Sequence, residues 1–190
     1  MGGESLSPAM QALYSQGLEA GEALLPPDAE LTVFEAVAFG RPERLDELLS
    51  AEPELVNAFS VDGFTPLHLA CFAGGAATAG LLVGRGADLE ALARSSSARV
   101  RPLGTAAFSG DRESAAVLLD AGADPNGRGE GGFTPLHSAA QNGDGELVRL
   151  LLRHGGDPNA AAADGRTPAD VARAAGHEEC AALLGGSDVS

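Results

Sequence analysis

The chain contains neither lysine nor tryptophan, and it has only one tyrosine and two cysteines among its 190 residues. Without lysine it lacks a Schiff-base nucleophile and the lysine of a phosphate-binding loop, which excludes the enzyme classes that depend on them. The two cysteines, Cys71 and Cys180, are far apart in the sequence and lie in helix-like stretches. We therefore expect small buried side chains rather than a disulfide framework.

Positive charge is also scarce, since 27 acidic residues face 12 basic ones and leave a formal charge of −15. A surface this negative repels nucleic-acid phosphates and anionic lipid headgroups, so we expect neither nucleic acid nor membrane as a partner. The N-terminus has no basic and apolar signal pattern, and residues 67–83 are too weakly apolar to span a bilayer. We expect a cytoplasmic protein, with the Ala-, Gly- and Arg-rich composition of a bacterial gene.

Bulky side chains are few, because aromatic residues make up 4% of the chain while alanine and glycine number 36 and 26. About a third of the residues thus contribute almost no volume to a core. Such a chain cannot fill one large central core, and it favours closely stacked helices in an elongated array.

A repeated tetrapeptide organises most of the sequence. Thr-Pro-Leu-His occurs at 65–68 and 134–137, with altered copies at 101–104 and 167–170. Threonine is a good helix N-cap and proline is favoured at the first helical position, so each copy predicts the start of a helix. A glycine at a similar spacing marks the break before each predicted second helix, at Gly40, Gly74, Gly110, Gly143 and Gly176.

These markers, recurring every 33 to 36 residues together with Gly-Ala-Asp after the second helix, resemble the ankyrin repeat family. The resemblance implies an all-α, helix-turn-helix solenoid with β-hairpin-like finger loops and a concave face on which partners bind. It divides the chain into an N-terminal helix and linker (1–30), an ankyrin domain (31–184) and a disordered tail (185–190). The five expected repeats are 31–62 as N-terminal cap, 63–95, 96–131, 132–164 and 165–184 as C-terminal cap.

The segment before the repeats predicts a helix from Ser7, as N-cap, through apolar residues at helical spacing to Leu25. We expect it to cover the exposed edge of the first repeat. Two alternatives remain open: a detachable partner-binding helix, and a self-association device.

Candidate binding residues come from the resemblance. The fingertip and first-helix positions that usually contact partners in this family fall at Asp62, Phe64, Phe72, Arg99, Arg101, Phe108, Ser109, Arg128, Glu130, Phe133, Gln141, Asn142 and Arg166. The four phenylalanines would form an aromatic cluster typical of binding hot spots, unless they merely pack against the loops. A lengthened finger carries Arg99 and Arg101, and we hypothesise that it meets an acidic or phosphorylated patch; a solvated loop is the alternative.

Patterns that suggest catalysis or metal binding have simpler explanations. G-x-G-x-x-G at 127–132 falls in a predicted finger, without the strand and helix of a dinucleotide site. His-Glu-Glu-Cys-Ala at 177–181 lacks the second histidine of a zinc helix. The family uses residues such as His68 and His137 to hydrogen-bond neighbouring repeats. We expect no cofactor and no metal, the alternative being a small enzyme or metal protein using these histidines and nearby carboxylates.

The sequence therefore predicts a non-catalytic protein–protein interaction module. It would be a monomeric adaptor, regulator or inhibitor that binds another protein through the concave face of the solenoid. The residues do not identify the partner.

Overall fold

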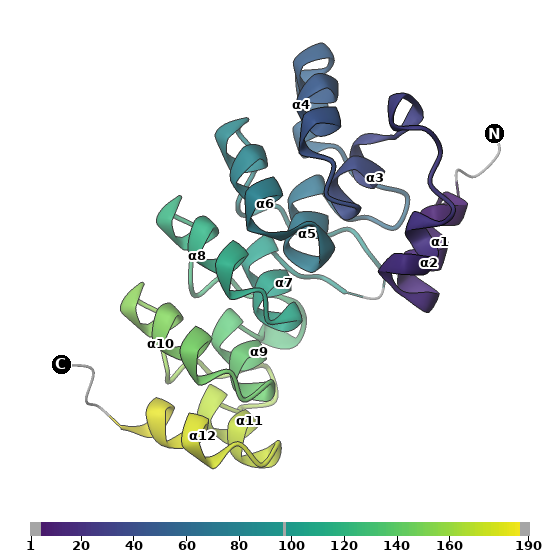
Figure 1. The fold of residues 1–190 in the computed structure, drawn as a ribbon. Helices are drawn as coiled ribbons and strands as arrows, with labels where there is room; N and C mark the ends of the chain where they lie inside the picture. Colours follow the sequence, from purple (N-terminus) through teal and green to yellow (C-terminus); the bar gives the residue numbers. More distant parts are fainter. Residues whose placement is uncertain (1–4, 97, 187–190) are drawn as a thin grey trace.

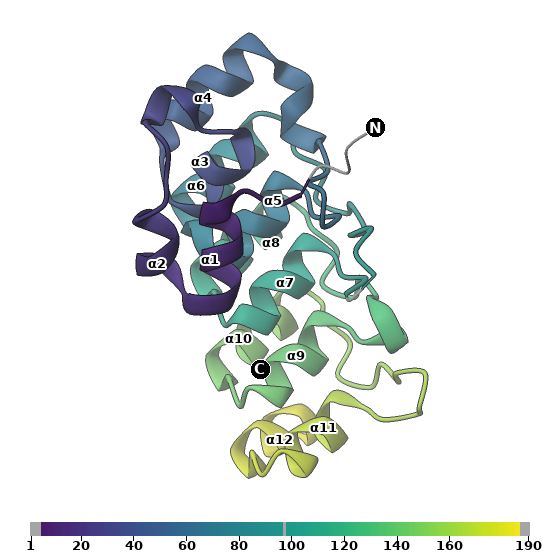
Figure 2. The ribbon, with the colours of Figure 1, turned by 90° about the vertical axis from the view of Figure 1, so that its right-hand side faces the viewer.

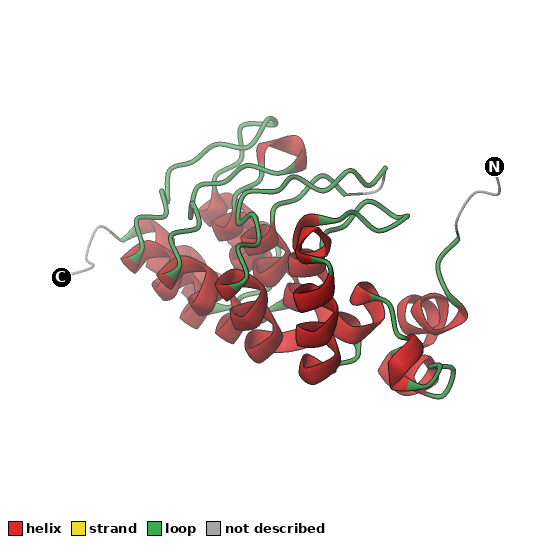
Figure 3. Cartoon of the chain, turned by 90° about the horizontal axis from the view of Figure 1, so that it is seen from above, coloured by secondary structure: helices red, strands yellow, loops and turns green. Residues whose placement is uncertain are grey.

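The computed structural model describes residues 5–96 and 98–186, and within them the chain forms helices joined by loops, with no strand. Pairs of antiparallel helices stack side by side into an elongated array (Figure 1). The long loops project together from one side of the array, as fingers (Figure 3). The all-α solenoid predicted from the repeats is confirmed.

The helices fall into two rows. The inner row holds the first helix of each repeat: α3 (Val33–Ala38), α5 (Pro66–Leu69) with its π-helical continuation η3 (Ala70–Gly74), α7 (Pro102–Ser109), α9 (Pro135–Gln141) and α11 (Pro168–Ala174). The outer row holds α4 (Pro42–Ala51), α6 (Gly75–Gly84), α8 (Arg112–Asp120), α10 (Gly145–Arg153) and α12 (Glu178–Gly185). Short 3-10 turns are η2 (Pro53–Asn57) and η4 (Glu130–Gly132).

The repeated motif starts the inner helices as predicted. Thr65 and Thr134 each precede a helix whose first residue is proline, and each forms a capping box with the histidine three residues later. Gly110 and Gly143 follow the inner helices with φ of 76° and 68°, a conformation that favours glycine. The chain therefore reverses at the same point in these repeats.

The second repeat departs from the expected break. We predicted the turn at Gly74, but Gly74 ends the π-helix η3 and the positive φ, 74°, belongs to Gly75. A π-helical turn holds more residues than an α-helical one, so the break falls one residue later. The finger that we predicted to be lengthened, which carries Arg99 and Arg101, includes Ser97, and Ser97 lies outside the described residues.

The core is a line of leucines that runs through the stacked repeats. Each is fully buried between neighbouring helices: Leu45, Leu49, Leu67, Leu82, Leu103, Leu118, Leu136, Leu147 and Leu151. Alanines fill the remaining space and allow the close helix approach that the composition suggested. Cys71 and Cys180 are free and buried, as expected.

The N-terminal segment forms two helices rather than the single one we predicted. Ser7 caps α1 (Pro8–Gln16), but Gly17 has a φ of 95° and separates α1 from α2 (Leu18–Glu22); η1 (Asp28–Glu30) follows. The pair lies beside α3, on the side of the inner helices, and does not extend across the end formed by α4 (Figures 1 and 2). Of the predicted tail, residues 187–190 lie outside the described residues, and α12 extends to Gly185.

One local weakness can be tested in α6, which contains a glycine in its interior. Gly80 has ordinary helical geometry, and an added methyl group would meet nothing within 4 Å. Gly80→Ala is therefore expected to raise the free energy of unfolding by about 0.5–1 kcal/mol, because alanine loses less backbone entropy. Urea denaturation measures this change, and Gly63→Ala is the contrasting variant. Gly63 has a φ of 87° and its Cβ would lie 2.5 Å from the Ser95 nitrogen, so that change should destabilise.

Candidate protein-binding surface

An apolar pocket of about 320 Å³ opens on the face formed by the inner helices. Its walls come from α1, from α5 and η3, from α7, from the start of α9, and from the finger before α7. The N-terminal helices lie beside α3 on this face, and they do not extend to α9 and α11 (Figure 2). We call this hollow the aromatic pocket, after four of its lining residues: Tyr14, Phe64, Phe72 and Phe108.

The rings of the aromatic pocket are unusually accessible. Phe72 and Phe108 are 46% and 68% exposed, although both are large apolar side chains. The Tyr14 ring lies against Phe72, with 6.2 Å between ring centroids, and Phe64 packs edge-on against His68 at 5.8 Å. Exposed aromatic side chains that gather in one hollow are typical of protein-binding sites.

The π-helix η3 is what carries Phe72 to this surface. Its neighbour Cys71 is fully buried, and the Cys71 carbonyl accepts a hydrogen bond of 2.7 Å from the Ser109 hydroxyl of the next repeat. The irregular turn is thus fixed to α7, whose Phe108 lines the same pocket. Insertions of this kind inside helices often occur at functional sites.

A missing side chain in the third repeat makes room for the pocket. In the second repeat the His68 Nε2 lies 2.9 Å from the Val100 carbonyl oxygen, and His137 makes the equivalent contact to Arg166 at 3.1 Å. The third repeat has Gly104 at this position, and Gly104 lines the pocket. Any Cβ there would lie 2.7 Å from Val100 Cγ2, so a larger residue would narrow the hollow.

Tyr14 belongs to the site but was missing from the sequence-based set. Its hydroxyl lies near the Asp62 carboxylate, and burial together with that carboxylate raises the pKa of Tyr14 above its ordinary value. The Asp62 carboxylate accepts a hydrogen bond from the Ser60 hydroxyl, which fixes the carboxylate in the turn at the tip of the first finger. Tyr14 is the only tyrosine of the chain and the only aromatic residue of α1, and this was the only signal that could have indicated it.

Most of the finger arginines interact with other groups of the same chain. This argues against the hypothesis that they bind an acidic patch on a partner. Arg101 forms an ion pair with Glu90 at 3.1 Å and donates to the Arg128 carbonyl at 2.9 Å. Arg128 donates in turn to the Ala161 carbonyl at 2.7 Å, and Arg94 stacks on the Phe59 ring at 3.7 Å. Arg99 remains exposed, so the hypothesis depends on this one residue.

The remaining predicted residues lie further along the fingers and inner helices. Phe133 packs on His137 at 4.9 Å under the Arg166 guanidinium, outside the aromatic pocket. Asn142 donates to the Phe108 carbonyl at 2.9 Å and so fastens two inner helices together. The Glu130 backbone N–H donates to the Arg99 carbonyl at 2.6 Å, whereas Gln141 is simply exposed. Of the predicted phenylalanines, Phe64, Phe72 and Phe108 meet in one pocket and Phe133 does not.

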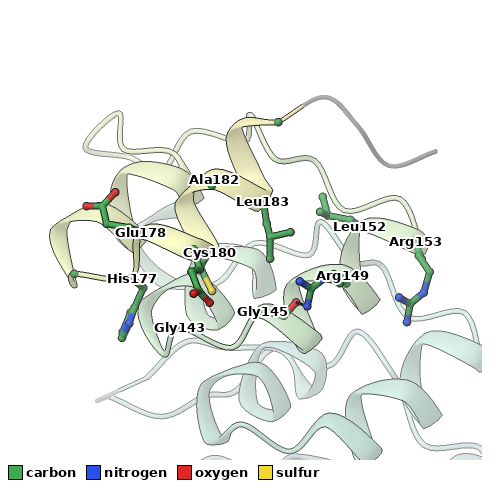
Figure 4. A pocket seen from close by; sticks show the side chains of 13 residues that line it. Gly143, Gly145, Arg149, Leu152, Arg153, His177, Glu178, Cys180, Ala182 and Leu183 are labelled. Carbon is green, nitrogen blue, oxygen red and sulfur yellow. Dashed lines mark hydrogen bonds between the residues drawn. The ribbon is translucent and has the colours of Figure 1, made fainter.

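A second, wider depression of about 1090 Å³ lies between α10 and α12 (Figure 4). His177, Cys180 and Arg149 line it, but burial raises the pKa of the Cys180 thiol, and a protonated thiol is a poor nucleophile. Among residues 5–96 and 98–186, no cluster of three potential metal ligands occurs. The G-x-G-x-x-G pattern forms a finger loop around η4 and not a dinucleotide site.

The two repeat histidines are neutral, structural groups. In each, Nδ1 accepts the backbone N–H of the preceding threonine, so Nε2 carries the proton donated to the next repeat. Burial lowers the pKa of both His68 and His137, although their carbonyl partners oppose that shift. A second proton on either ring would break the bond at Nδ1.

Acid is therefore expected to destabilise the fold well above the range in which carboxylates titrate. The unfolded chain would bind protons near pH 6.5 and the folded chain would not, so stability is complete above that pH and falls below it. The expected loss is about 1.4 kcal/mol per pH unit for each histidine until its folded pKa is reached. Urea denaturation at pH 7.5, 6.5 and 5.5 measures the slope. Backbone hydrogen bonds lower the pKa values of Asp164 and Asp170 in the folded chain. The stability that these two carboxylates provide is complete above pH 3.8 and is lost only as the pH falls below that value.

Comparison with known proteins agrees with this architecture. A family model described as ankyrin repeats (3 copies) matches residues 33–129 and 103–190. A search of curated proteins found no match. In the part of the chain that the structure describes, no helix is long and apolar enough to cross a membrane.

Proposed function

Because the chain belongs to the ankyrin repeat family, whose repeats are generally protein–protein interaction modules, we propose that it binds a protein partner through the inner-helix face centred on the aromatic pocket. The observation that carries this proposal is the convergence of Tyr14, Phe64, Phe72 and Phe108 in one open hollow. Binding itself would be the activity, as in a non-catalytic adaptor, regulator or inhibitor. The proposed state is a monomer in the cytoplasm, and the buried free thiols are compatible with a reducing compartment.

Affinity capture with matched variants tests the proposal. The wild-type chain and two double variants would be immobilised, exposed to lysate of the source organism, and the retained proteins identified by mass spectrometry. Phe72→Ser with Phe108→Ser removes the two exposed rings of the pocket. Leu18→Ser with Leu24→Ser is the control, because these side chains are similarly exposed, at 49% and 53%, and lie outside the pocket. The binding constant of each purified candidate would then be measured by calorimetry.

A partner bound by wild type and control but lost by the pocket variant supports the proposal. Equal binding to all three chains would place the interface elsewhere. Loss with the control alone would assign binding to the N-terminal helices, the alternative raised by the sequence. Circular dichroism of each variant verifies that the loss does not reflect unfolding.

A further inference from the structure

Half of the aromatic residues of this chain line one pocket. The sequence contains one tyrosine, seven phenylalanines and no tryptophan, and four of these eight rings meet in the aromatic pocket. Aromatic ring faces carry negative electrostatic potential, so they attract a cation placed over them. Aliphatic residues would have provided an apolar hollow equally well without this property.

Negative charge accompanies the rings. Asp62 lies against the Tyr14 hydroxyl, and the first 62 residues hold 12 acidic residues against two arginines. Among the arginines of the finger before α7, Arg101 is paired with Glu90 and Arg94 lies over the Phe59 ring, whereas Arg99 is exposed and opposes this attraction. A cationic group in the pocket is therefore attracted by the rings and by the Asp62 carboxylate near Tyr14.

We propose that the aromatic pocket receives the side chain of an arginine or lysine in a basic segment of the partner protein. This inference rests on the proposed function and specifies what that partner presents. The pocket volume of about 320 Å³ is at the small end for ligand sites and suits one long side chain. Leu69 and Val100 offer apolar walls for its methylene stem, while the aromatic rings receive the charged head, with Asp62 behind the Tyr14 hydroxyl.

The pocket contains its own reporter, which makes a direct test possible. Tyr14 is the only tyrosine and the chain has no tryptophan, so tyrosine fluorescence reports on the pocket alone. The probes are acetylated, amidated pentapeptides of the form Gly-Ser-X-Ser-Gly, in which X is arginine, lysine, citrulline or norleucine. Citrulline has nearly the shape of arginine without its charge, and norleucine keeps an apolar chain. Titrations at constant ionic strength give a dissociation constant for each peptide.

The arginine peptide is expected to bind roughly 5- to 30-fold more tightly than the citrulline peptide, which corresponds to the usual strength of a cation–π contact. Phe72→Leu keeps apolar bulk but removes a ring, and it should abolish most of this preference. Asp62→Asn should weaken the arginine peptide and leave the citrulline peptide unchanged. The control is Phe34→Leu, which makes the same change in a different hollow.

Two results would overturn the inference. If norleucine or citrulline binds as tightly as arginine and lysine, the pocket takes a neutral apolar anchor. If no peptide changes the fluorescence or competes with the captured partner, the pocket does not take a cationic side chain. In both cases a partner whose binding depends on Phe72 and Phe108 would leave the proposed function intact. If partner binding does not depend on Phe72 and Phe108, the proposed function itself is wrong, whatever the peptides show.

Discussion

Replacing His137 by alanine is expected to lower the free energy of unfolding by roughly 3–4 kcal/mol. The side chain is fully buried, its Nδ1 accepts the Thr134 N–H at 3.1 Å, and its Nε2 donates to the Arg166 carbonyl at 3.1 Å. Alanine would leave the Thr134 N–H without its side-chain acceptor and would create a cavity between the fourth and fifth repeats. Urea denaturation followed by circular dichroism measures the loss.

His154→Ala is the matched control for this prediction. His154 lies at the end of α10, and its Nε2 is 3.9 Å from an Asp120 carboxylate that is well exposed. Weak ion pairs at the surface contribute little to the free energy of unfolding, so we expect His154→Ala to change it by less than about 0.5 kcal/mol. A loss below about 1 kcal/mol in His137→Ala would show that the bonds between repeats are not what holds the C-terminal repeats in register.

The repeat framework could be predicted from the sequence because its determinants are local. Thr134 and Pro135 define a helix start by their own side chains, and Gly143 defines the turn by a backbone conformation that other residues avoid. Such signals act over three or four residues and recur at a fixed period. The same short range explains why the all-α solenoid and its inner row of helices were predicted correctly.

The pocket could not be predicted, because it depends on contacts between distant residues and on a side chain that is missing. Tyr14 and Phe72 lie on different helices, and nothing near either of them indicates that they meet. Gly104 appeared to be a weakened motif, whereas in the structure its lack of a side chain opens the hollow. Arg101 appeared available for a partner until Glu90 was placed beside it. Sequence patterns define the repeats, but departures from them gain meaning only in three dimensions.

Docking of α1 should therefore control binding, and Leu13→Asp tests this directly. Leu13 is 8% exposed among apolar neighbours, so a carboxylate there would detach α1 from α3 and remove Tyr14 from the pocket. Partner affinity is expected to fall roughly 10- to 30-fold, because a tyrosine at the centre of an interface often contributes that much. Calorimetry with the captured partner measures the loss, and hydrogen exchange reports which helices have opened.

The five repeats should stay folded in Leu13→Asp, since each repeat is stabilised mainly by its neighbours in the array. Leu18→Asp supplies the control, because Leu18 on α2 is 49% exposed and accepts a charge without burying it. Unchanged affinity in Leu13→Asp, with exchange confirming that α1 has opened, would remove Tyr14 from the binding site. A change in molecular mass by light scattering would instead indicate that the N-terminal helices govern self-association. An unchanged mass with lost affinity leaves α1 as a wall of the binding site, which extends the binding surface beyond the five repeats.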